Sequence, residues 1–134
     1  TKVDYTIFFR KLSNIPDKLM DLKNSFYLPS SEEIESKWIS WLQRWREHII
    51  KKGDQRKISA EMKLSNPKYT WREWLVTPAY EKAEKGDYSL IREIQAVLAK
   101  PYEEQSLEVQ KKYDRLKPNK FFRAGGISHY SCSS

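Results

Sequence analysis

Apolar residues recur at helical spacing through most of this chain, and the clearest example follows Pro29. Ser30 and Glu33 form a capping box there and Gly53 supplies a stop, so we predict one long helix between them. Its apolar positions repeat every three or four residues on one face: Ile34, Trp38, Trp41, Leu42, Trp45 and Ile49. A tryptophan stripe with this spacing is typical of core packing, or of a seam against another part of a longer protein, and only rarely of a base-stacking platform.

The segments after Gly53 are also predicted to be largely helical. Residues 54–65 predict a short polar helix or a helical turn, and residues 106–116 predict a further helix. No stretch combines strand alternation with a hairpin turn, so the predicted fold class is all-α. We expect one helical bundle-like domain over residues 1–117, followed by a loop and a flexible polar tail over residues 118–134.

Between these two helices lies a segment punctuated like a helical hairpin. Thr70 and Glu73 form a second capping box. Pro78 can restart a helix at its first turn, and Gly86 can end it. The helix after Gly86 then has a stripe that is expected to be buried: Ile91, Ile94, Val97 and Leu98.

The net charge of +7 is concentrated in two segments. Residues 44–72 carry nine Lys or Arg against three acidic residues, and residues 111–123 carry six against one. Such segments can bind phosphate or an acidic partner, although most basic helical segments of small domains are simply a solvated face. No apolar run approaches the roughly 18 residues that span a bilayer, so no membrane association is expected.

The chain offers few residues with catalytic or ligand-binding potential. It has no glycine-rich phosphate loop, and its two histidines, His48 and His129, have no cysteine or acid at metal-ligand spacing. His48 lies on a basic helical segment and is expected to face solvent. We therefore predict no catalytic, cofactor-binding or metal-binding residue within these 134 residues.

The only cysteine, Cys132, lies on the polar tail just after Gly125 and Gly126. A thiol at such a position has no packing role, so its use would be reactivity, and the glycines would let the tail reach a partner. We do not expect Cys132 and His129 to act alone as a nucleophile and base, because a tail cannot preorganise them. A lone cysteine also indicates a reducing compartment.

Several stretches together resemble a known family: "MKLSNPKYTWREWL", "AYEKAEKGDYSLIREIQAVLAKPYEEQ", the terminal "SCSS" and, more weakly, "DYTIFFRKLS". Their order and spacing are similar to the C-terminal end of the selenoprotein O (YdiU) family, over nearly the whole chain. Two features depart from it. Many members read Leu-Arg-Asn where this chain has Trp71, Arg72 and Glu73, and Pro78 interrupts what is often a continuous helix. The chain also starts within an amphipathic pattern without an initiator methionine, which suggests a piece of a longer protein.

The resemblance implies a kinase-like fold that transfers AMP from ATP to serine, threonine or tyrosine hydroxyls of proteins, with Mg²⁺ or Mn²⁺. The ATP and metal ligands would lie upstream, so this chain would be an accessory region that packs on the catalytic lobe and is not catalytic alone. The family has cysteine or selenocysteine at the position of Cys132, which implies redox exchange with a cysteine of the missing catalytic region. Its partners would be that upstream domain and the protein substrates, in the cytoplasm of a bacterium or the mitochondria of a eukaryote.

A second hypothesis is a stand-alone helical module whose basic segments bind nucleic acid or an acidic protein. Of these partners, nucleic acid is not expected if the family resemblance holds. The two hypotheses differ in one measurable property, because binding to nucleic acid weakens steeply with salt as counterions are released.

Overall fold

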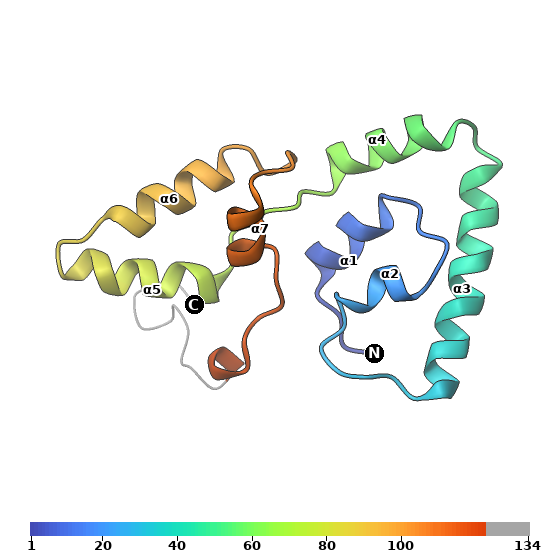
Figure 1. Ribbon diagram of the computed structural model, residues 1–134, viewed down its shortest axis with the longest axis horizontal. Coiled ribbons are helices and arrows are strands. Elements are labelled where there is room, and N and C mark those ends of the chain that lie inside the picture. The colour runs from blue at the N-terminus through green and yellow to red at the C-terminus, as the bar shows by residue number, and fades with distance from the viewer. Residues whose placement is uncertain (123–134) are drawn as a thin grey trace, which may run out of the picture. The chain divides into compact units, whose positions relative to one another are not determined.

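The computed structural model of the chain describes residues 1–122. Regular structure in this range is helical apart from an isolated antiparallel bridge between Val3 and Phe26, which confirms the all-α prediction. The chain divides into two compact units, Thr1–Lys68 and Tyr69–Ser134. Their elements are α1 (Tyr5–Leu12), α2 (Met20–Lys23), α3 (Glu32–Ile50), α4 (Gln55–Ser65), α5 (Glu73–Glu84), α6 (Ser89–Leu98) and α7 (Leu107–Tyr113), which Figure 1 labels, and the 3₁₀ helix η1 (Asn119–Phe122).

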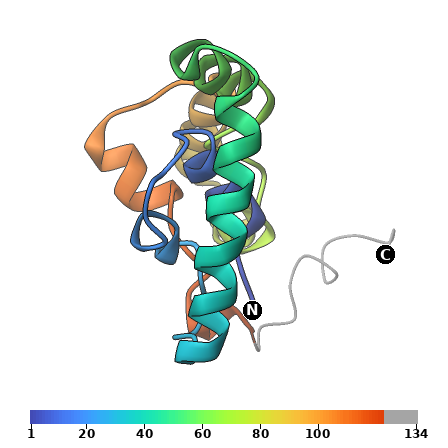
Figure 2. The same ribbon diagram turned by 90° about the vertical axis from the view of Figure 1, so that its right-hand side faces the viewer.

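The first unit begins with α1, which has a capping residue of its own. Asp4 is in extended conformation, and its Oδ1 accepts a hydrogen bond of 3.1 Å from the backbone N–H of Ile7. The helix buries Phe8 and Leu12, and Tyr5 in its first turn is exposed. Both views show α1 and the short α2 beside the long α3 (Figures 1 and 2).

The long predicted helix is present as α3, but its cap is one residue later than predicted. Ser31, not Ser30, is the N-cap, and its Oγ accepts a hydrogen bond from the N–H of Ile34 at 3.4 Å. Adjacent serines offer two possible caps, and capping at Ser31 leaves Glu33 and two other glutamates in the first turn, where the helix dipole favours negative charge. The helix ends at Ile50, shortly before Gly53, whose positive φ of 138° closes the turn into α4.

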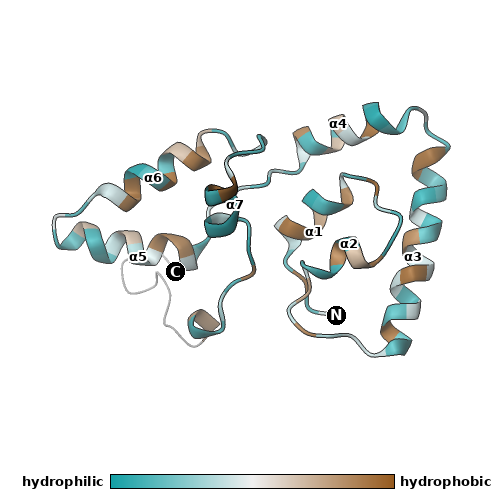
Figure 3. Cartoon of the chain, in the orientation of Figure 1, coloured by the Kyte–Doolittle hydropathy of each residue, from teal (hydrophilic) through white to brown (hydrophobic). Residues whose placement is uncertain are grey.

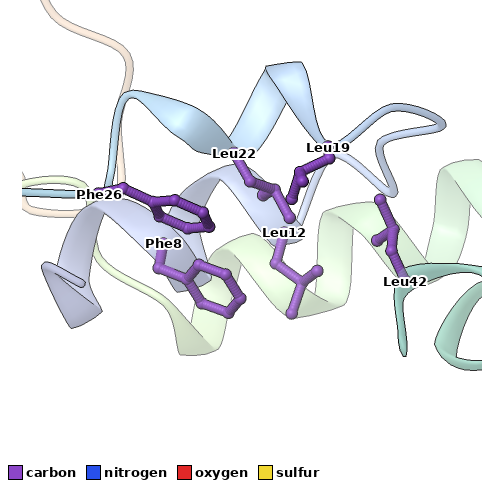
Figure 4. Packing of buried hydrophobic residues seen from close by; sticks show 6 residues of the cluster. All are labelled: Phe8, Leu12, Leu19, Leu22, Phe26 and Leu42. Atoms are coloured by element: carbon purple, nitrogen blue, oxygen red, sulfur yellow. The ribbon is translucent and has the colours of Figure 1, made fainter. Parts of the chain in front are cut away.

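The predicted packing role of the tryptophan stripe is confirmed. Trp38 and Trp41 lie 5.5 and 6.1 Å from the ring of Phe8, measured between ring centroids, and Trp38 also lies 5.3 Å from the ring of Phe26. Trp45 stacks on Trp41 at 6.2 Å. These partly buried rings cover a cluster of six buried residues, shown in Figure 4: Phe8, Leu12, Leu19, Leu22, Phe26 and Leu42.

The second unit corrects two predictions about the helical hairpin. Helix α5 runs without interruption through Pro78, which therefore neither restarts a helix nor interrupts one. The N-cap is Arg72 rather than the predicted Thr70, and the Arg72 side chain makes no capping hydrogen bond. Glu73 is the first helical residue, and a capping box needs the acid at the third, from which it can reach back to the cap.

Helices α5 and α6 form the antiparallel arms of a hairpin (Figure 1), with Gly86 at a φ of 85° in the turn. Apolar and polar stretches alternate along both arms (Figure 3). The stripe of α6 that was predicted to be buried is so only in part: Ile94 and Val97 are buried, and Ile91 and Leu98 are partly buried beside them. The buried cluster of this unit is Tyr69, Ala79, Ile94, Val97 and Tyr113.

The last elements are shorter than the sequence suggests. Helix α7 ends at Tyr113 rather than near Leu116, and Ser106 caps it by accepting a hydrogen bond of 3.2 Å from the N–H of Val109. Residues 118–122, expected to begin a loop, contain η1. The rest of the predicted tail lies outside the described residues.

Candidate functional site

The structure describes some of the residues singled out from the sequence and not others. Cys132, His129 and the Gly125-Gly126 pair lie outside the described residues, so nothing here tests them. His48 is exposed on α3, as predicted. Among residues 1–122, no group of three or more His, Cys, Asp and Glu side chains is arranged to hold a metal ion, and no helix is both long and apolar enough to cross a membrane.

The segment "MKLSNPKY", which carries part of the family resemblance, is anchored at the end of α4. Asn66 follows the helix, and its Nδ2 donates to the carbonyl oxygen of Met62 at 2.9 Å and to Oγ of Ser13 at 3.2 Å. The Ser13 hydroxyl donates in turn to the carbonyl of Phe9 at 2.8 Å. One asparagine side chain therefore joins the C-terminus of α4 to the C-terminus of α1.

Arg10 makes the second link between the same two helices. Its side chain is only 6% exposed, and its Nη1 donates to the carbonyl oxygens of Lys63 and Asn66 at 3.0 and 3.1 Å. Carbonyls in the last turn of a helix lack intrahelical donors, and a cation there also complements the helix dipole. Arg10 therefore stabilises the end of α4 and fixes the course of the chain into Pro67 and Lys68.

The loop after α1 is held by α3 and α4. Ile15 has a φ of 52°, which is unusual for a β-branched residue, and its side chain is buried. Arg46 of α3 donates to the carbonyl oxygen of Ile15 at 2.5 Å and forms an ion pair with Asp17. Ser59 of α4 donates to the carbonyl of Ser13 at 2.6 Å. This loop is therefore fixed by side chains from two other helices.

In the second unit, Glu93 of α6 holds α7 in place. Its Oε1 accepts hydrogen bonds from Nζ of Lys112 at 2.5 Å and from the hydroxyl of Tyr113 at 2.7 Å. These two donors lower the pKa of Glu93 below its ordinary value. Burial first, and then the carboxylate of Glu93, raise the pKa of Tyr113. The phenol therefore stays protonated and donates to a carboxylate that stays ionised at neutral pH.

The departure from the family pattern at Trp71 and Glu73 lies where the second unit begins. Trp71 is exposed, whereas Trp74, one turn on, is buried, with the guanidinium of Arg115 5.1 Å from its ring centroid and the ring of Phe121 5.9 Å away. An apolar groove, called here the α5–α6 groove, lies beside Trp71. It is lined by residues of α5 and α6, among them Val76, Tyr80, Ile91, Gln95 and Leu98.

The basic character of residues 44–72 is most exposed at the turn between α3 and α4. Lys51, Lys52, Arg56 and Lys57 are exposed there, and none of them forms an ion pair with another residue of the described part of the chain. The tryptophan rings of α3 pack against the buried cluster of the first unit rather than lying on this basic surface. The turn thus offers positive charge without a ring on which a base could stack.

Comparison with known proteins tests the resemblance directly. A model of the family "Protein adenylyltransferase SelO" matches residues 1–99, about three quarters of the chain. The chain belongs to the SelO protein adenylyltransferase family. Proteins named "Protein nucleotidyltransferase YdiU" match over most of the chain. The protein from Azoarcus sp. (strain BH72) is 33% identical over 141 residues and that from Flavobacterium johnsoniae is 33% identical over 144 residues, covering 99% and 100% of this chain.

The SelO relatives are much longer than this chain. The match covers 26% of the Azoarcus protein, 27% of the Flavobacterium protein and 21% of the Pseudomonas aeruginosa (strain LESB58) protein, which is 36% identical over 106 residues. The chain therefore spans about a quarter of the length of these curated SelO relatives. The family prediction is confirmed.

Proposed function

We propose that this chain is the C-terminal accessory and redox-regulatory region of a protein adenylyltransferase. The parent enzyme transfers AMP from ATP to serine, threonine or tyrosine hydroxyls of protein substrates. The observation that carries this proposal is the family match over residues 1–99, together with the quarter-length coverage of the YdiU relatives. The relatives named above are bacterial, which with the lone cysteine favours a reducing cytoplasm.

ATP and its Mg²⁺ or Mn²⁺ are proposed to bind in the rest of the parent protein. The sequence of this chain supports that assignment, because it has no glycine-rich phosphate loop and no kinase-like lysine or metal-binding motif. The bonds of Arg10, Asn66 and Arg46 join helices within the first unit, and Glu93 joins helices within the second. Such bonds support two units that are each fixed internally and that present surfaces to the catalytic part.

The proposed redox residue is Cys132. Its thiolate would exchange with a disulfide oxidant of the glutathione class, and the mixed disulfide would then be displaced by a cysteine of the catalytic region. The two protein thiols lose two electrons and two protons, and the oxidant is reduced to two thiols. The resulting bridge would restrain the enzyme, and a reducing thiol would reverse it.

The test uses the full-length parent protein with its own cysteines. Adenylylation of a generic protein acceptor is measured after oxidation, with and without dithiothreitol, for the wild type, Cys132→Ser and the neighbouring control Ser131→Ala. We expect dithiothreitol to stimulate the wild type and Ser131→Ala but not Cys132→Ser. Equal stimulation of all three proteins would refute the redox role and leave the adenylyltransferase assignment standing.

The alternative of a polyanion-binding module has one observation in its favour, the four exposed cations at the turn between α3 and α4. Fluorescence anisotropy with a labelled single-stranded oligonucleotide at increasing salt tests it. Binding in the micromolar range at physiological salt, lost in Lys51→Ala/Lys52→Ala, would favour this alternative. We expect only feeble binding there, because the turn offers charge without a stacking surface.

A further inference from the structure

One side of the α5–α6 hairpin is apolar and open. Val76 and Tyr80 of α5 line the α5–α6 groove from one side, Ile91 and Leu98 of α6 line it from the other, and Trp71 lies at its edge. Trp71 is 55% exposed, so a large aromatic side chain at this edge has more than half of its surface in solvent. A contiguous apolar surface of this kind, unlike a single exposed residue, can serve as an interaction site.

The apolar face of α6 is wider than the part of it that neighbouring helices bury. With residues 100° apart, the arc from Val97 through Ile94 and Leu98 to Ile91 spans about 120°. The buried part, Val97 and Ile94, belongs to the cluster with Tyr113 of α7. The other part, Leu98 and Ile91, is only partly buried and lines the groove. This side of the hairpin therefore presents Leu98 and Ile91 as a partly open apolar surface.

We propose that the α5–α6 groove is the docking surface for an amphipathic helix from the part of the parent protein outside these 134 residues. The SelO relatives are about four times as long as the matched segment, so a full-length protein has ample chain to fill the groove. This inference rests on the proposed function, in which that remaining part is the catalytic region.

The lining defines the chemistry of the occupant. Aliphatic and aromatic side chains form most of the groove, and Gln95 is the one amide among them. A helix that presents aliphatic side chains at successive turns fits such a surface, as in other helix-in-groove complexes. The amide of Gln95 can both donate and accept hydrogen bonds, so the occupant should bring a polar group to its position.

Side-chain labelling of the full-length parent tests occupancy. Trp71 and Tyr88 form a matched pair, because they are 55% and 54% exposed in this structure and only Trp71 borders the groove. Carbene labelling of each residue is normalised to its labelling in urea. We expect Trp71 to be labelled about fivefold less than Tyr88, because a helix seated in the groove would cover the Trp71 ring and exclude solvent from it. Equal labelling of the two residues would overturn the proposal.

Photo-crosslinking identifies the occupant. Full-length parent is prepared with p-benzoylphenylalanine in place of Tyr80, which lines the groove, or of Tyr88 as the control. The proposal expects crosslinks from position 80 to residues outside this chain but within the same molecule. The proposal would be refuted by crosslinks between two isotopically distinguished copies or by crosslinks to residues 123–134. The absence of any crosslink from position 80 would refute it as well. Neither measurement requires adenylylation, so the proposed function can fail independently of this result.

Discussion

The guanidinium of Arg46 donates a 2.5 Å hydrogen bond to the carbonyl oxygen of Ile15, a β-branched residue held at a φ of 52°. A side chain other than glycine costs about 1–2 kcal/mol in the left-handed region. The native bonds of Arg46 to Ile15 and Asp17 oppose that cost and fix the loop against α3.

The positive φ of Ile15 predicts that a glycine variant at this position is more stable than an alanine variant, the reverse of the order inside a helix. Ile15→Gly and Ile15→Ala both remove the buried side chain, but glycine adopts positive φ without strain, so Ile15→Gly should be the more stable by about 1 kcal/mol. At Ile39, within α3, the order should reverse, because glycine is about 1 kcal/mol worse than alanine inside a helix. Hydrogen exchange of the α3 amides measures both pairs. The same order at both sites would contradict the strained conformation of Ile15.

Arg10→Lys should weaken the attachment of α4 to α1. A lysine ammonium cannot reproduce the planar guanidinium that bonds the carbonyls of Lys63 and Asn66, and a buried carbonyl without a donor costs about 1–3 kcal/mol. We expect that loss in the opening free energy of α4, measured by hydrogen exchange. The control is Arg44→Lys, whose arginine is exposed and, within residues 1–122, bonds only Ser40 in the same helix. Arg44→Lys is expected to lower the opening free energy of α4 by less than about 0.5 kcal/mol. An equal loss in both variants would show that Arg10 does not anchor α4 to α1.

Helices and their buried faces could be predicted because the signal is local. The repeat that includes Trp38 and Leu42 depends only on residues within a few turns, and its packing face is the one observed. Boundaries were less certain where two residues compete, as Ser30 and Ser31 do for the cap of α3. The short α2 is only four residues long, too short for a helical repeat of apolar residues to be recognised in the sequence.

The anchoring contacts of the site could not be predicted from the sequence. Arg46 reaches a carbonyl 31 residues away and Arg10 one 53 residues away, and backbone acceptors leave no mark on residue identity. The α5–α6 groove was hidden for a related reason. The stripe that includes Ile91 and Leu98 was predicted to be buried, but only the folded hairpin shows that part of it is open. The family resemblance, in contrast, depended on residue order alone.

The two faces of α3 should differ sharply in their contribution to stability. Leu42 is 2% exposed at the centre of the first cluster, so Leu42→Ala should cost about 2–5 kcal/mol through lost contacts and a residual cavity. Ile39 is 44% exposed, so Ile39→Ala should cost less than about 1 kcal/mol. Urea unfolding followed by near-ultraviolet circular dichroism compares them. Similar costs would mean that the packing face of α3 has been misassigned.

Residues 1–134 alone should show no specific binding of ATP with Mg²⁺. The sequence offers no backbone cradle for a triphosphate, so isothermal titration should give only heats of dilution. The far-ultraviolet spectrum of the same sample must be helical for the result to count, and full-length parent protein serves as the positive control. A saturable micromolar site on the isolated chain would place part of the nucleotide site within it.

The attachment of α7 to α6 should weaken in acid. Lys112 and Tyr113 donate to Glu93 and lower its pKa in the folded state, so the unfolded chain binds a proton more readily. The stabilisation is therefore present above the ordinary glutamate pKa of about 4.3 and is lost as the pH falls through the lower folded value. We expect hydrogen-exchange protection of the α7 amides, corrected for intrinsic rates, to decrease below about pH 4.3 in the wild type.

Two variants assign this acid sensitivity to Glu93. Glu93→Gln removes the titrating group, so protection of α7 should be lower at neutral pH and nearly flat across this range. Glu81→Gln, at an exposed position of α5, should keep the wild-type profile. Tyr113→Phe leaves the Glu93 carboxylate with one donor fewer. The acid-dependent loss of α7 protection in Tyr113→Phe should therefore lie between that of the wild type and that of Glu93→Gln. An unchanged profile in Glu93→Gln would show that another carboxyl group controls the attachment of α7 in acid.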